Sequence, residues 1–136
     1  MIEFENSIFT MISKPLREKY QKNIFITGEQ VSTVQKVFPA VSIVQKSNDI
    51  LMKTRTTDCN ENHAIVMVEI DVYSNLNTGK KQQTKEIIGL INDILVSHNF
   101  TRVFCQPLDN LANAKIYRIK ARFKAVIGKD GTIYTI

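Results

Sequence analysis

The feature that most constrains the fold is a strict two-residue alternation near the C-terminus, over residues 115–127. Every second position is apolar: Tyr117, Ile119, Ala121, Phe123, Ala125 and Ile127. Four of the five positions between them carry cations, which form a basic row: Arg118, Lys120, Arg122 and Lys124. Because successive side chains of a β-strand point to opposite faces of its sheet, this period predicts a long strand with one apolar and one basic face. We expect helices to cover the apolar face.

A second alternating segment, residues 64–73, predicts another strand with two unlike faces. One face carries Val66, Val68, Ile70 and Val72, and the other carries Met67, Glu69, Asp71 and Tyr73. We expect only the valine and isoleucine face to be buried, because half-buried strands alternate in this way.

Shorter strands complete the predicted sheet, at residues 37–44, 101–106 and 132–136. Pro39 should begin the first of these strands or lie on a sheet edge, since proline cannot donate to a ladder. Pro107 should end the second. Residues 128–131 have the composition of a hairpin turn leading into the last strand.

Two segments have the three-and-four spacing of apolar residues that is typical of an amphipathic helix. The first covers residues 2–22, where Pro15 should kink the helix, or end it near Ser13 and restart it. The second covers residues 80–98 and follows a turn that offers several possible N-cap residues. We expect His98 to lie partly buried near the negative end of this helix.

Residues 46–63 are polar and have no apolar period. Connections of this length in a compact domain are usually functional or disordered, so we expect a mobile loop or a long, twisted hairpin. Four charged residues in it are candidates for assembly contacts: Lys53, Arg55, Asp58 and Glu61. No repeat or linker divides residues 1–136, which are predicted to form a single α+β domain. Its mostly antiparallel sheet is packed by two main helices, in the order helix, strands, helix, strands.

The composition favours a water-soluble fold with one core. The chain has 136 residues, 43% of them hydrophobic, and no apolar run approaches the length of a membrane-spanning helix. The acidic N-terminal residues lack the features of a secretory signal, so we expect synthesis in a cytoplasm and no membrane partner. The net charge of +5 suits a nucleic-acid or acidic-protein partner, and equally suits ordinary solubility.

The residues needed for catalysis or metal binding do not form a recognisable motif. Only His63 and His98 are available as bases for a nucleophile, and the five glycines form no phosphate-binding loop. Cys59 and Cys105, even together with these histidines, lack the paired short spacings of a zinc site. The sequence therefore predicts a binding protein that is not an enzyme and needs no metal or cofactor.

The basic row has two interpretations. In the first, it is a solvated outer face on which Glu69 and Asp71 neutralise part of the charge by cross-strand pairing. In the second, it is an electropositive patch for a nucleic acid or an acidic protein surface. Tyr117 and Phe123 lie on the opposite strand face, so we expect no base stacking beside the cations and no sequence-specific RNA reading.

Several segments, taken in order, carry a resemblance to a known family: Phe38–Ile43, Val68–Asn75 running into Gly79-Lys80-Lys81, Asn99–Arg102, Cys105–Pro107, Asn110-Leu111 and Ile116–Phe123. With the predicted order of elements, they make the chain resemble the small tail-completion or tail-terminator proteins of the head–tail joining region of long-tailed phages and Gram-positive prophages. The resemblance covers nearly the whole chain and is one of pattern and order.

The resemblance implies a structural virion protein. Such proteins form a ring, commonly a homohexamer, that caps the finished tail tube and offers a surface to the head connector or neck protein. It implies assembly in the host cytoplasm and a final place in the virion, where the basic row would line a subunit contact or face passing DNA. Two alternatives remain: a neighbouring neck or minor capsid protein, or a basic nucleic-acid-binding domain without sequence preference.

Overall fold

The computed structural model describes residues 3–20, 24–28, 38–50, 63–76, 78–108 and 116–134. These residues form a single α+β domain of two helices and a six-stranded, mostly antiparallel sheet, as predicted. The elements follow in the order α1 (Glu5–Tyr20), β1 (Phe25–Thr27), β2 (Ala40–Ile50), β3 (His63–Ser74), α2 (Lys80–Ser97), β4 (Thr101–Leu108), β5 (Tyr117–Gly128) and β6 (Ile133–Tyr134).

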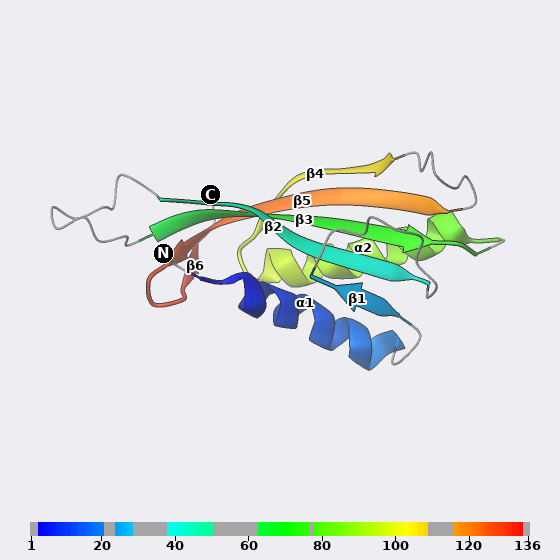
Figure 1. The fold of residues 1–136 in the computed structure, drawn as a ribbon, viewed down its shortest axis with the longest axis horizontal. Coiled ribbons are helices and arrows are strands. Elements are labelled where there is room, and N and C mark those ends of the chain that lie inside the picture. The colour runs from blue at the N-terminus through cyan, green and yellow to red at the C-terminus, as the bar shows by residue number, and fades with distance from the viewer. Residues whose placement is uncertain are drawn as a thin grey trace, which may run out of the picture.

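The strands lie in the order β1-β2-β3-β5-β4, and β6 pairs with β5 (Figure 1). Only the β1–β2 pairing is parallel. The two alternating strands, β3 and β5, are direct neighbours at the centre and pair along their whole length, from His63 with Gly128 to Ser74 with Tyr117. The turn between β5 and β6 contains Gly131 at φ 86°, a conformation that glycine adopts without strain.

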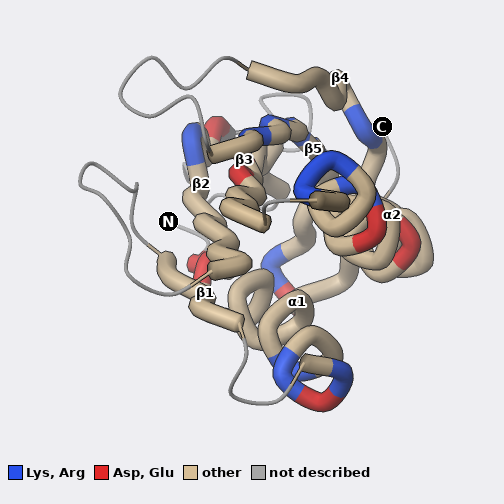
Figure 2. The backbone as a smooth tube through the Cα atoms, turned by 90° about the vertical axis from the view of Figure 1, so that its right-hand side faces the viewer, with Lys and Arg blue, Asp and Glu red and all other residues tan. Residues whose placement is uncertain are grey.

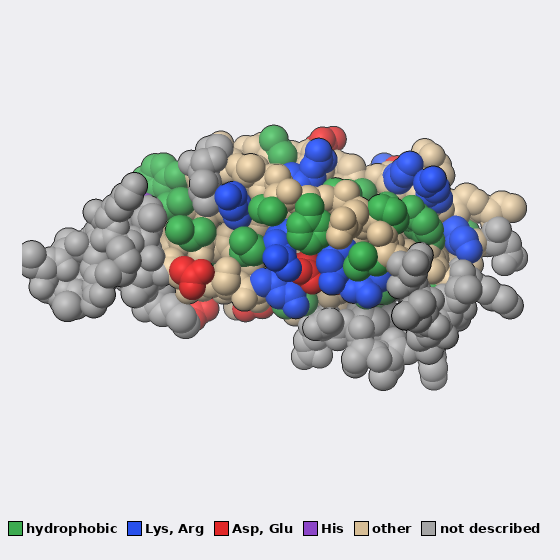
Figure 3. All heavy atoms as spheres, turned by 90° about the horizontal axis from the view of Figure 1, so that it is seen from above, with side chains coloured by type: hydrophobic (Ala, Val, Ile, Leu, Met, Phe, Trp, Pro, Cys, Tyr) green, Lys and Arg blue, Asp and Glu red, His purple; other side chains and the backbone are tan. Residues whose placement is uncertain are grey.

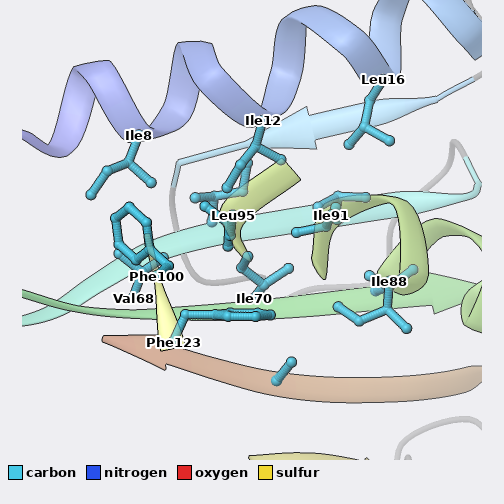
Figure 4. Packing of buried hydrophobic residues seen from close by; sticks show 14 of the residues in the cluster. Ile8, Ile12, Leu16, Val68, Ile70, Ile88, Ile91, Leu95, Phe100 and Phe123 are labelled. Carbon is cyan, nitrogen blue, oxygen red and sulfur yellow. The ribbon is translucent and has the colours of Figure 1, made fainter. Parts of the chain in front are cut away.

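Both helices lie on the same side of the sheet (Figure 1). Ile8, Ile12 and Leu16 of α1 and Ile88, Ile91 and Leu95 of α2 point toward the apolar faces of β3 and β5 (Figure 4). Phe123 is the largest of the completely buried side chains there. Burial of apolar area at about 25 cal/mol per Å² is the main favourable term in such a core.

Helix α2 confirms the predicted helix over residues 80–98. Its ends differ from the expectation: the N-cap is Gly79, with φ 82° and no side-chain cap. At the other end, Asn99 has φ 70°, the Asn99 N–H donates to the Val96 carbonyl, and the Phe100 N–H donates to the Leu95 carbonyl. This is a Schellman ending, and the burial of Phe100 supplies its usual apolar contact.

Helix α1 overturns one of the two alternatives predicted for Pro15, the end near Ser13. It is one continuous helix through that residue, with no break near Ser13. Proline removes one backbone hydrogen bond, but Ile12 and Leu16 on either side of it are completely buried. Packing of the apolar stripe therefore holds the helix together across the proline, as tertiary contacts commonly do.

Two strands are longer than predicted. Pro39 directly precedes β2, as expected, but β2 continues to Ile50 and its residues 47–50 pair with 64–67 of β3. The predicted loop at 46–63 therefore began too early in the chain. Residues 46–50 belong to a strand, as the alternative prediction of a long hairpin requires. Strand β4 likewise continues through Pro107 to Leu108, because β4 is an edge strand, where the missing N–H is tolerated.

Candidate functional site

The most distinctive site is the sheet face opposite the helices. The antiparallel register of β3 and β5 places Glu69 opposite Arg122, Asp71 opposite Lys120, and Tyr73 opposite Arg118. Directly opposed residues of two strands point to the same face, so the two acids lie among the cations of the basic row. Figure 2 shows the acidic positions of β3 between basic positions of β2 and β5. We call this surface the ladder face.

Glu69 is the centre of an ion-pair cluster. The Arg122 Nη2 donates to its Oε2 at 2.6 Å, and the Lys120 Nζ lies 3.1 Å from its Oε1. The Lys46 Nζ, from β2, lies 3.8 Å from the same Oε1. One carboxylate therefore binds three cations from two neighbouring strands.

Asp71 has one main partner, Arg118. The Arg118 Nε and Nη2 both lie 3.1 Å from Asp71 Oδ1. The Asp71 and Glu69 residues are each only 4% exposed, although both helices lie on the other side of the sheet. Figure 3, which looks onto the ladder face, shows acidic atoms largely covered by basic side chains. The prediction that this face of β3 is not buried was therefore wrong, because long cationic side chains cover short acidic ones.

Aromatic rings from the neighbouring strands flank the basic row, although Tyr117 and Phe123 of β5 itself lie on the other face. The guanidinium of Arg118 lies 5.3 Å from the ring centroid of Tyr73, and that of Arg122 lies 5.2 Å from the ring centroid of Phe104. Cation–π contacts at this distance are attractive. Phe104 reaches this face because β4 has a register shift between Arg102 and Phe104, so Phe104 pairs with Arg122.

The two carboxyl groups are tuned in opposite directions. Burial acts to raise the pKa of Glu69, but the bonds from Arg122 and Lys120 and the charge of Lys46 outweigh it, so the pKa is lower than usual. Burial also raises the pKa of Asp71, and there Arg118 and Lys120 offset only part of the effect. Glu69 is thus stabilised as an anion, whereas ionised Asp71 is less well compensated.

Lys124 differs from the other members of the basic row. It lies opposite Met67 of β3 and Thr101 of β4, and among the described residues no carboxylate pairs with it. The structure therefore brings Arg118, Lys120 and Arg122 together with acids and leaves Lys124 at one end of the row. Cross-strand pairing, the first interpretation of the basic row, describes three of its four members.

The other sequence candidates that the structure describes do not form a site with these residues. Lys53, Arg55, Asp58, Glu61 and Cys59 lie outside the residues that the structure describes. His98, which was expected to be partly buried, is exposed at the end of α2, with Nδ1 2.8 Å from the Ile94 carbonyl oxygen, and Cys105 is exposed on the edge strand β4. Over the described ranges, no three His, Cys, Asp or Glu side chains are grouped so as to hold a metal ion.

Comparison with protein-family models gave no match for this chain, and comparison with curated proteins gave none either. Neither described helix is long and apolar enough to cross a membrane.

Because the two comparisons gave no match, the ladder face must be interpreted from its own chemistry. Its acids bind cations in the folded state, and its cations keep further N–H donors for an external anion.

Proposed function

We propose that this chain is a structural virion protein of a long-tailed phage or prophage. It forms a ring at the end of the tail tube, terminates tail assembly and joins the tail to the head connector. The resemblance described above supports this proposal, and the α+β fold with its order of helix, strands, helix, strands is compatible with it. Its partners are further copies of itself, the tail tube protein and a connector or neck protein, met in the host cytoplasm and then in the virion.

The observation that carries the proposal is that the sheet ends in two unlike edges. One edge is β1, a three-residue strand parallel to β2, and the other is β4, antiparallel to β5. Among the described residues, each of these strands pairs on one side only. Unlike edges suit head-to-tail contacts between identical subunits, which form a ring when the rotation between neighbours closes.

Strand β4 carries the features that limit open-ended pairing. Its register shift after Arg102 and its Pro107 interrupt the row of backbone donors on the free edge. Contacts at this edge would therefore use side chains, among them Val103, which is 45% exposed. Such an edge favours a specific contact with a neighbour over unlimited sheet extension.

The ladder face gives less support to a nucleic-acid-binding domain. Three of the four cations in the basic row contact buried carboxylates, so fewer of their charges are available for phosphates. A neighbouring neck or minor capsid protein would share the same fold features, and only the position in the virion separates it from a terminator. We propose a role without catalysis, metal or cofactor in either case.

Light scattering over a range of protein concentrations tests the ring. We expect a mass close to that of six chains of 15.5 kDa, and closed rings in electron micrographs. Val103→Arg should lower the mass, because it places a charge in the edge contact. Val96→Arg is the matched control: Val96 is 50% exposed on α2 and should tolerate the change. A monomer at every concentration, or equal effects of the two variants, would contradict the proposal.

A further inference from the structure

The ladder face carries more positive charge than its own acids can neutralise. In its central part, five cations, Lys46, Arg118, Lys120, Arg122 and Lys124, accompany the two carboxylates of Glu69 and Asp71, and exposed Asp49 near the end of β2 adds only one more. We infer that the ladder face is a docking surface for an acidic protein surface supplied by a different chain. The inference stands on the chemistry of this face and does not need the ring proposed above.

The cations of the ladder face are oriented before any partner arrives. Arg122 is fixed by its bond to Glu69 and by the ring of Phe104, and Arg118 is fixed by Asp71 and Tyr73. Each guanidinium has five N–H donors, more than these contacts use, and Arg118 and Arg122 side chains remain 22% and 34% exposed. Prior fixation reduces the side-chain entropy that a partner must overcome. The buried acids therefore act as positioning residues for the arginines.

Apolar side chains border the cations on the same face. Four half-buried apolar residues pair directly with charged residues of the ladder face and therefore point to the same side: Val44, Met67, Phe104 and Leu108. Figure 3 shows apolar side chains around the basic cluster. Arginine, phenylalanine and methionine are enriched in protein–protein interfaces, whereas a phosphate backbone offers no apolar contact to such side chains. The composition therefore favours a protein partner over a nucleic acid.

A second copy of the chain is a poor source of the acidic partner. The chain has a net charge of +5, and the first turns of α2 expose Lys81 and Lys85. Two copies would repel each other unless an acidic patch faced the basic one. The exposed acids of the described residues are spread over the segment before α1, both helices, β2 and the β5–β6 turn: Glu3, Glu5, Glu18, Asp49, Glu86, Asp93 and Asp130. Charge complementarity is instead met by a separate, acidic chain.

Binding of labelled peptides tests the inference. The probes are a synthetic peptide that alternates glutamate with leucine, a polyglutamate of equal charge, and a short DNA duplex, each measured by fluorescence polarisation. We expect the glutamate–leucine peptide to bind about tenfold more tightly than polyglutamate or DNA, because only it satisfies both charge and apolar contacts. Raising the salt concentration should weaken its binding.

Two matched charge reversals locate the contact. Lys124→Glu should weaken peptide binding about fivefold, because it removes the cation that no described acid pairs with. Lys85→Glu, an equal charge change on exposed α2, should leave binding within about twofold. If Lys124→Glu lowers the melting temperature, Lys124→Gln replaces it. The inference would be overturned if DNA bound more tightly than the glutamate–leucine peptide, or if both reversals had equal effects. It would also be overturned if Lys124→Glu, but not Lys85→Glu, abolished self-association.

Discussion

The two faces of strands β3 and β5 are stabilised in different ways. On the helix side, alternate residues such as Ile70 and Phe123 are buried in an apolar core under α1 and α2. On the ladder face, the residues between them, such as Glu69 and Arg122, form ion pairs beneath long cationic side chains. Glu69 and Ile70 are adjacent in sequence, and both are nearly inaccessible to water. Burial alone therefore does not distinguish the two faces.

The two faces differ in how strongly their stability depends on particular partner side chains. Hydrophobic contacts are non-directional and scale with the area removed from water, so the core tolerates changes that preserve volume. A buried carboxylate requires its particular cations and donors, since an unpaired buried charge is costly. We therefore expect the core to supply most of the stability, and the ion pairs of the ladder face to add to the specificity of register between β3 and β5.

Phe123→Ala should cause the largest loss of stability in this comparison. The side chain is completely buried, and its removal should lower the free energy of unfolding by about 3–5 kcal/mol. Phe104→Ala is the matched control, because Phe104 is a half-buried phenylalanine on the ladder face of the neighbouring strand. It should cost about 1 kcal/mol. Denaturant unfolding measures both values, and similar losses would contradict a difference between the faces.

Glu69→Gln should lower the free energy of unfolding by about 1–3 kcal/mol at neutral pH, because three cations lose their shared anion. The folded pKa of Glu69 lies below its usual value of 4.5. The stability that ionised Glu69 contributes is therefore present above that usual value and is lost as the pH falls through the lowered folded pKa. Unfolding measured from neutral to acidic pH should show wild type and variant converging. A constant difference would contradict the assignment.

Asp71→Asn should have the smallest effect, below about 1 kcal/mol at neutral pH, because the amide oxygen can still accept from Arg118. The folded pKa of Asp71 lies above its usual value of 3.8. A group whose pKa is raised in the folded state adds stability at pH values below its usual pKa. This stability is lost as the pH rises through the folded pKa. Relative to the wild type, Asp71→Asn should therefore gain stability with rising pH, whereas Glu69→Gln should lose it. Parallel pH profiles for the two variants would show that the two sites are not tuned oppositely.

The local patterns of the sequence determined much of the fold. The two-residue period of β3 and β5 and the helical period of α2 identify each element and its apolar face without knowledge of any partner. These periods are properties of a single segment. The α+β class and the order of helices and strands could therefore be predicted, whereas the pairing of the two acids with the basic row was one of two interpretations that the sequence left open.

Only the tertiary structure decided how the ladder face is built. Phe104 stands beside Arg122 because a register shift in β4 changes which residues of that strand share a face, and Lys46 reaches Glu69 from β2. The burial of Glu69 and Asp71 likewise depends on side chains from another strand. Pairings between strands far apart in sequence depend on register and bulges, which the period within one strand does not encode.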